Sequence, residues 1–205
     1  MRDMKRDERR AGRARFALCA ALCGGLLLLL AGCGGSLYKV KPVVAGPITA
    51  AGKSVEGDGL RLSAVPLLSD EESQELFEAN LPLAGLLPVR VELTNTGGAP
   101  LALKKRLRFR LTDAEGKRWK MRDAGQAVSR ILKSDQVTLY NPNARSAFEE
   151  AFRQHALDTA APLGPGETRR GLLFFQTPKK QPVESPRSLT LYLEGPQQPL
   201  ALRLN

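Results

Sequence analysis

The fold is decided by residues 87–98, which read Leu87-Pro88-Val89-Arg90-Val91-Glu92-Leu93-Thr94 and then Asn95-Thr96-Gly97-Gly98. In the first eight residues, apolar side chains alternate with polar ones or proline, which is the pattern of a β-strand with one buried face. The next four residues form turns readily, because Asn and Gly tolerate the backbone angles of a tight turn. A half-buried strand that ends in a turn favours an antiparallel sheet.

The same period of two recurs on both sides of this strand. Strands are predicted over residues 60–64, 87–94, 103–111, 117–121, 172–175, 189–193 and 200–204. Asp113 to Gly116 supplies a hairpin turn between two of them. Residues 172–175 are apolar on both faces, which indicates a central strand. The chain therefore has seven or so short strands.

Residues 123–160 interrupt this period with helical spacing. Phe148, Phe152 and His155 lie on one helical face, behind Ser146 as a cap with Glu149 three residues later. A capping box over residues 69–72 opens another short helix. We predict helices over about 69–80, 123–133 and 143–158. The economical fold is mainly β, an antiparallel sandwich with a helical insertion at about 123–160.

Several of these motifs resemble a known group of domains. The motifs are Asn95-Thr96-Gly97, Phe109-x-Leu111-x-Asp113-x-x-Gly116-x-x-Trp119, Gly164-Pro165-Gly166-Glu167 and Gly171-Leu172-Leu173-Phe174-Phe175. They resemble the immunoglobulin-like domains of bacterial envelope proteins, over Asp58 to Asn205 apart from the insertion. The resemblance implies an immunoglobulin-like β-sandwich that serves as a binding or assembly module, and it brings no catalytic residue.

The N-terminal region has the anatomy of an export signal. Residues 2–15 carry seven Lys or Arg, residues 16–31 are largely apolar, and the sequence Leu30-Ala31-Gly32-Cys33 follows. This arrangement resembles the signal of bacterial lipoproteins. The resemblance implies cleavage before Cys33, a diacylglycerol on the Cys33 thiol and an acyl chain such as palmitate on the new amino terminus.

An uncleaved membrane anchor over residues 16–32 is the alternative. Its 17 residues are at the lower limit for crossing a bilayer of about 30 Å, and Gly24 and Gly25 each weaken a helix by roughly 1 kcal/mol. Gly34, rather than Asp, follows Cys33, and by resemblance this favours the outer membrane, with the domain facing the periplasm.

The predicted organisation has three parts. Residues 1–32 are a lipoprotein signal peptide, residues 33–57 are the lipidated cysteine and a tether, and residues 58–205 are the sandwich. A flexible tether of 24 residues spans roughly 25–30 Å. The alternative is that Val40 to Val44 form a short first strand, which would shorten the tether. Removing residues 1–32 lowers the formal net charge from +10 to +6, because they carry seven basic and three acidic side chains.

Few residues suited to catalysis or metal binding remain in the mature chain. Cys19 and Cys23 leave with the signal, Cys33 is consumed by the lipid, and His155 is the only histidine. Zinc sites that use several Cys or His side chains are excluded, and so is an H-E-x-x-H helix. No G-x-S-x-G motif surrounds a serine. We therefore expect no enzyme, no metal and no cofactor.

The hairpin over residues 104–122 is strongly basic. Its nine cations are Lys104, Lys105, Arg106, Arg108, Arg110, Lys117, Arg118, Lys120 and Arg122. Arg106, Arg108 and Arg110 share one face of the predicted strand. The functional interpretation is a surface for phospholipid headgroups, lipopolysaccharide phosphates or an acidic protein, made by Arg106, Arg108, Arg110, Lys117, Arg118 and Lys120. The favoured alternative is a solvated edge hairpin whose charges prevent aggregation. Nucleic acid is excluded as a partner on grounds of compartment.

The remaining candidates favour structural roles. The acids Asp70, Glu71, Glu72, Glu75 and Glu78 suit the start of a helix, where they complement its dipole. We expect His155 at the rim of an apolar cluster, and we expect Trp119 and Tyr192 in core packing rather than stacked on sugars. The main functional hypothesis is a non-enzymatic, membrane-tethered binding or assembly module. The alternative is a proteinase-inhibitor-like module that presents an exposed loop over residues 81–88.

Overall fold

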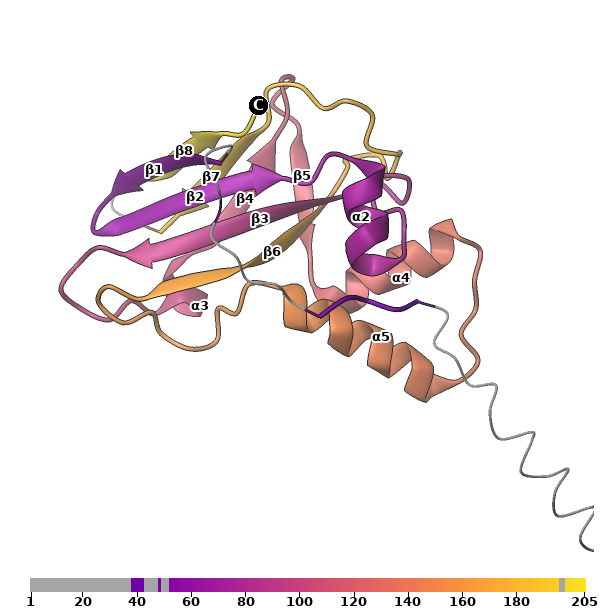
Figure 1. Ribbon diagram of the computed structural model, residues 1–205. Coiled ribbons are helices and arrows are strands. Elements are labelled where there is room, and N and C mark those ends of the chain that lie inside the picture. Colours follow the sequence, from indigo (N-terminus) through magenta and orange to yellow (C-terminus); the bar gives the residue numbers. More distant parts are fainter. Residues whose placement is uncertain (1–37, 43–47, 49–51, 196–197) are drawn as a thin grey trace, which may run out of the picture. The chain divides into compact units, whose positions relative to one another are not determined.

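Eight strands pair in one continuous antiparallel ladder in the order β1-β2-β3-β6-β5-β4-β7-β8 (Figure 1). The computed structural model describes residues 38–42, 48, 52–195 and 198–205, and Tyr38–Asn205 form one compact unit. The strands are β1 (Lys53–Gly57), β2 (Leu60–Pro66), β3 (Leu86–Asn95), β4 (Arg108–Thr112), β5 (Arg118–Arg122), β6 (Thr168–Gln176), β7 (Thr190–Glu194) and β8 (Leu200–Arg203). The helices are α2 (Asp70–Phe77), α3 (Leu103–Arg106), α4 (Ala124–Ser134) and α5 (Pro142–His155).

The predicted signal peptide and Cys33 lie outside the described residues, so cleavage and lipidation stay predictions. Among the helices that are described, none combines the length and the apolar character needed to cross a bilayer.

The ladder folds over at β5 into two layers. Arg118 and Trp119 of β5 pair with β4, whereas residues 120–122 pair with β6. One layer therefore has the order β2-β3-β6-β5, with β1 added outside β2, and the other has the order β4-β7-β8. This is the strand order of the immunoglobulin sandwich. The predicted fold class is confirmed.

The first hydrophobic core lies between the two layers. It contains alternate residues of β3, namely Leu87, Val89, Val91 and Leu93, all fully buried. Leu111 of β4 and the leucines of β7 and β8 meet them from the opposite layer. The alternation that predicts this strand also sets its buried face, because successive side chains on a strand point to opposite sides.

The second hydrophobic core lies between the outer face of the first layer and the helices. Leu172 and Phe174 of β6 face this core, while Leu173 and Phe175 face the sandwich. Figure 1 shows α2, α4 and α5 gathered at one end of the first layer. Phe152 of α5 lies with its ring centroid 5.5 Å from that of Phe174. The prediction of a central strand with two apolar faces is confirmed.

The three predicted helices are present, but one of them has a different cap from the one predicted. The side-chain oxygen of Ser69 accepts from the Glu72 N–H at 3.1 Å at the start of α2, as the capping box predicts. However, α5 begins at Pro142, where Asn141 rather than Ser146 is the cap. Proline suits the first helical position because its nitrogen has no hydrogen to leave unpaired there.

The folded unit begins before Asp58, in contrast to the tether predicted over residues 33–57. Strand β1 pairs with β2 along its whole length. The Lys41 N–H donates to the Leu76 carbonyl at 2.9 Å, and Tyr38 is buried in the helical core. The range carries two prolines and five glycines, and its apolar residues follow no sustained period that indicates these contacts.

The strand predicted over residues 103–111 is interrupted. Residues 103–106 form the single turn α3, closed by the Leu107 N–H on the Leu103 carbonyl at 2.9 Å, and β4 starts at Arg108. The pairing with β7 ends at the same point, because Arg108 pairs with Glu194, the last residue of β7.

The two outermost strands of the ladder approach each other. A Cβ added to Gly57 at the end of β1 would lie 2.7 Å from a methyl carbon of Leu200 in β8. The Gln198 N–H donates to an Asp58 carboxylate oxygen at 3.2 Å. The sandwich is thus nearly closed on the side where its ladder begins and ends.

Candidate functional site

The predicted basic residues gather on the outer face of the second layer. Leu111, Leu191 and Leu193 point into the sandwich, so the residues between them point outward. Across the β4–β7 pair, Arg110 lies opposite Tyr192 and Arg108 lies opposite Glu194. Because directly opposed residues of antiparallel strands project to the same side, these four side chains share one surface.

We call this surface the basic face. Its cations are Arg108, Arg110, Arg118 and Arg203. On the described strands of this layer, Glu194 is the one carboxylate that points the same way. All of the cations are exposed except Arg110, which is half-buried. The large helices pack on the other layer, so they leave this face open to solvent.

The centre of the basic face is a stack of Arg110 on Tyr192. The Arg110 guanidinium carbon lies 4.5 Å from the centroid of the Tyr192 ring. The Arg110 Nε lies 3.0 Å from a Glu194 carboxylate oxygen, in an ion pair without hydrogen-bond geometry. A guanidinium over an aromatic ring is attracted by the ring quadrupole. Arg110 is therefore held in place, and one face of the Tyr192 ring is already occupied.

Three residues of the predicted surface lie elsewhere. Lys120 pairs with Gln176 of β6, so it belongs to the first layer. Arg106 belongs to α3, so the prediction that Arg106, Arg108 and Arg110 share one strand face is wrong. Lys117 lies in the β4–β5 turn, where its N–H donates to Asp113 at 2.8 Å. Conversely, Arg203 was not predicted for this surface, because it is far away in the chain. The alternation of Leu200, Leu202 and Leu204 around it is the signal that marks it as outward-facing.

Trp119 lies on the inner side of β5, as predicted. It is buried in the sandwich core, and its indole N–H donates to an Asp113 carboxylate oxygen at 3.1 Å. The expectation of core packing is confirmed for Trp119. Tyr192 is half-buried on the basic face, where it packs against Arg110 rather than in the core.

A second cluster of cations lines a groove of about 430 Å³ between α4, α5 and the end of β6. Its arginines hold neighbouring elements together. Arg130 donates to the carbonyls of Ala84 and Lys180 at 2.7 and 2.6 Å, and Arg122 donates to Gln176 at 2.9 Å. These guanidinium groups cross-link the helices to loops and strands, so we assign the cluster a structural role.

The acidic residues of α2 have structural partners. Asp70, Glu71 and Glu72 lie in its first turn, where they complement the helix dipole. Glu75 pairs with Lys41 at 3.0 Å, and Glu78 accepts from the Lys39 N–H at 3.0 Å. The last two contacts fasten residues 38–42 to α2. Within the described ranges, no three His, Cys, Asp or Glu side chains are grouped so that they could hold a metal ion.

His155 lies inside the helical core, with 6% of its surface exposed. Its Nε2 lies 2.7 Å from the Lys41 carbonyl oxygen, and its ring centroid lies 5.1 Å from that of Phe77. The predicted association with Phe148 and Phe152 is confirmed, but His155 is buried rather than at the rim. It fixes residues 38–42 against α5.

Residues 81–88 do not form a protruding loop. Leu81, Ala84, Leu86 and Leu87 are fully buried, and Leu83 is the one residue of this segment that is exposed. The last three residues belong to β3. The segment predicted as a candidate inhibitory loop is thus part of the two hydrophobic cores.

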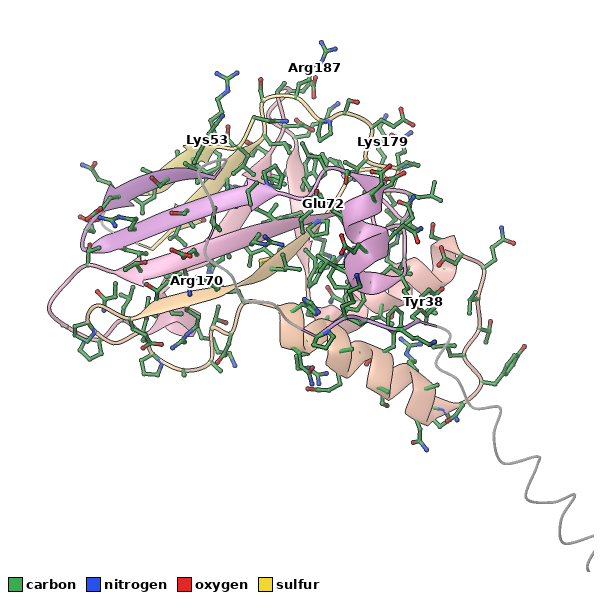
Figure 2. All side chains as sticks on the ribbon, in the orientation of Figure 1. Tyr38, Lys53, Glu72, Arg170, Lys179 and Arg187 are labelled. Carbon is green, nitrogen blue, oxygen red and sulfur yellow. The ribbon has the colours of Figure 1, made fainter. Side chains whose placement is uncertain are left out.

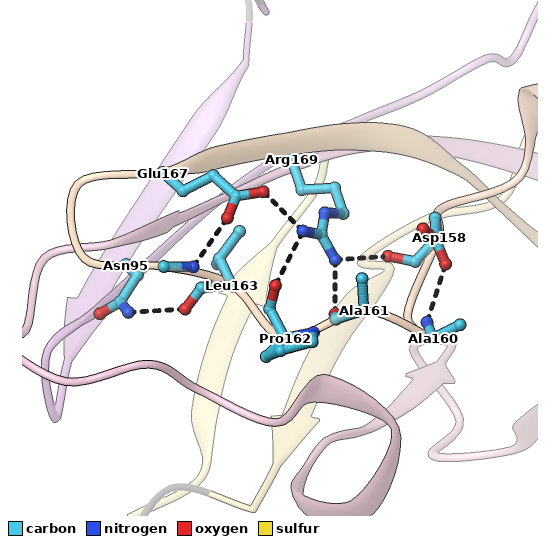
Figure 3. Close-up of polar contacts among 9 residues, drawn as sticks. Asn95, Asp158, Ala160, Ala161, Pro162, Leu163, Glu167 and Arg169 are labelled. Carbon is cyan, nitrogen blue, oxygen red and sulfur yellow. Dashed lines mark hydrogen bonds and ion pairs between the residues drawn. The ribbon is translucent and has the colours of Figure 1, made fainter.

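A polar network ties the end of the insertion to the sandwich (Figure 3). A Glu167 carboxylate oxygen accepts from the Gly164 N–H at 2.7 Å, and the other accepts from Arg169 at 2.5 Å. Together these contacts hold the pKa of Glu167 below its usual value, the Gly164 hydrogen bond most of all. Asn95 donates to the Leu163 carbonyl at 3.0 Å. The network stabilises the approach to β6.

The comparisons with known proteins give a fold likeness alone. No protein family model matches the chain, and no curated protein matches it. A conserved hypothetical protein from Bacillus anthracis is 13% identical, with a TM-score of 0.37, over 82% of this chain and 97% of that chain. An uncharacterised β-sandwich protein from Clostridium difficile 630 is 12% identical, with a TM-score of 0.36, over 82% and 95%. These likenesses assign no function.

Proposed function

We propose that this protein is a non-enzymatic lipoprotein of the bacterial envelope, anchored through Cys33, whose basic face binds the acidic surface of another envelope protein. The lipobox Leu30-Ala31-Gly32-Cys33 supports the anchor. The basic face supports the binding role, because it carries four cations and one carboxylate on a layer that the large helices leave open.

The chemistry of the basic face suits an acidic protein partner. Clustered cations raise the rate at which an anionic partner arrives, and they orient it. Arg and Tyr are enriched at protein interfaces, where a planar side chain buries area at low entropic cost. The stack of Arg110 on Tyr192 places these two residue types at the centre of the basic face, where they are already ordered before binding.

The alternative interpretation is that the charges protect a sheet edge. Strands β4 and β5 each end a layer, and only Leu111 and Thr112 of β4 pair with β5. Residues 108–110 therefore pair with β7 alone. Charges on such an edge block pairing with another molecule. The two interpretations differ in whether an acidic partner is lost when the charges are reversed.

The binding test uses charge reversal at the three exposed cations of this face: Arg108→Glu, Arg118→Glu and Arg203→Glu together. Arg110 is left unchanged because it holds Tyr192. The matched control reverses Lys53, Lys179 and Arg187, which are exposed and lie outside the basic face (Figure 2). Both variants are used as bait in detergent-solubilised envelope, at low and high salt.

We expect the wild type and the control to retain a partner that high salt releases, because exposed charges are screened over about 8–10 Å at 0.1–0.15 M ionic strength. The basic-face variant should lose that partner while it unfolds at an unchanged temperature. Equal retention by all three proteins would refute the role of the basic face. Loss of binding to anionic vesicles alone would point to lipid as the partner.

The anchor is tested by the intact mass of the protein extracted from membranes. We expect a mature chain that starts at Cys33 and carries acyl chains, in the outer-membrane fraction. Cys33→Ala should accumulate as an unprocessed precursor. A wild-type species that retains residues 1–32 would show that the segment is an uncleaved anchor.

A further inference from the structure

Tyr38 fixes the point where the chain enters the folded unit. Its ring stacks on Phe148 of α5 with centroids 4.5 Å apart and planes 3° from parallel. Its hydroxyl donates to an Asp135 carboxylate oxygen at 2.7 Å, directly after α4. Figure 2 shows Tyr38 beside α5. The entry point is therefore held at the end of the helical layer where α4 stops.

The reach of the chain before Tyr38 is short. Cys33 precedes Tyr38 by five residues, and five extended residues span at most about 17–18 Å. A compact domain of this size has a radius of gyration of about 15 Å, so it is wider than this segment is long. A lipid on Cys33 would thus keep the Tyr38 end of the domain at the membrane surface. The 24-residue tether predicted from the sequence would instead have held the domain away from the membrane surface.

The same end of the helical layer carries the most exposed large hydrophobic side chain of the described residues. Tyr140 is 92% exposed, in the loop between α4 and α5 that Asp135 opens. Its neighbours Val137 and Leu139 pack against the helical core. The loop is thereby anchored, while Tyr140 is held outside. Lys39 and Lys133, both exposed, lie next to Tyr38 and in the last turn of α4.

We propose that the α4–α5 loop docks on the membrane that holds Cys33, with Tyr140 in the headgroup layer and Lys39 and Lys133 facing lipid phosphates. Tyrosine is enriched at membrane interfaces because its ring is apolar and its hydroxyl is polar. Basic side chains near a surface are drawn to anionic lipids. The inference rests on the proposed lipid anchor, which keeps the loop at a high effective concentration near the bilayer.

The test uses the full-length protein, processed in cells, purified from membranes and reconstituted into phosphatidylethanolamine–phosphatidylglycerol vesicles. Tyr140→Cys carries a polarity-sensitive fluorophore. Arg187→Cys, labelled in the same way, is the matched control, since it is exposed and Figure 2 places it away from Tyr38. In the lipidated mature chain the introduced cysteine is the only free thiol, because Cys19 and Cys23 precede the cleavage site.

We expect the probe at position 140 to emit at shorter wavelength in vesicles than the control, and spin-labelled lipids to quench it several-fold more strongly. If both labelled variants are acylated and their probes show the same emission and the same quenching, the proposed docking surface is refuted and the lipoprotein proposal stands. A chain whose mass shows no acyl groups would overturn both. The unfolding temperatures of both labelled variants are also measured. Values equal to that of the wild type show that the label has not damaged the fold.

Discussion

The two layers of the sandwich present opposite chemistry on their outer faces. Outward positions of the first layer include Leu86, Leu172 and Phe174, and the helices cover them. Outward positions of the second layer include Arg110 and Tyr192, and the helices leave them open. Both layers follow the same alternation along their strands. The helical insertion is therefore part of the hydrophobic core rather than an appendage, because its helices bury the outer face of the first layer.

The largest expected effect comes from removing one aromatic side chain from each outer face. Phe174→Ala should lower the free energy of unfolding by about 3–5 kcal/mol, the usual range for a buried phenylalanine. Tyr192→Ala should cost about 1 kcal/mol or less, mainly the stack with Arg110. Urea denaturation of both variants measures the difference. Similar losses would mean that the two faces are equally buried in solution, and the comparison would fail.

An intermediate effect is expected where the insertion returns to the first layer. A Cβ on Gly171 would lie 2.4 Å from the Leu157 Cα, so Gly171→Ala forces backbone apart. We expect a loss of about 1–3 kcal/mol, typical of overpacking. Gly98→Ala is the control, because a Cβ there meets no described atom within 4 Å. Equal stabilities in thermal unfolding would show that the insertion is loosely attached.

The smallest effect concerns Glu167, in the segment that leads from the insertion into β6. Its pKa is lowered in the folded state, so its contribution to stability is present above the unfolded-state pKa and is lost as pH falls through the folded value. Stability measured from about pH 5 to pH 3 should therefore fall less steeply for Glu167→Gln than for the wild type. Parallel curves would show that its contacts do not persist in solution.

The covered face was predictable from sequence to a large extent. The apolar run over residues 172–175 indicates a strand buried on both sides, and helical spacing over residues 123–160 indicates what covers it. The sequence did not indicate that residues outside the insertion also help to cover this face. Residues 38–42 join it through single contacts such as the Lys41 carbonyl with His155, and isolated contacts between distant residues leave no period in a sequence.

The open face was predictable only in part. The alternation of Arg108 and Arg110 with apolar residues indicates outward side chains, which the structure confirms. The register of β4 on β7 decides that Arg106 lies outside the strand and that Arg203 shares the surface. Register depends on pairing between segments about 80 residues apart, which no local pattern encodes.

The approach of β1 to β8 determines how another protein is able to recognise this domain. An exposed outer strand offers a row of backbone donors and acceptors, and many partners bind by adding a strand of their own. Here the first and last strands of the ladder flank each other at Gly57 and Leu200. A strand from another protein could pair with β1 or β8 on this side only after the two strands had separated. Donor-strand exchange and templated self-association are both disfavoured at this edge. Recognition then depends on side chains displayed by the faces and loops, a mode in which single substitutions tune specificity without disturbing the backbone that presents them.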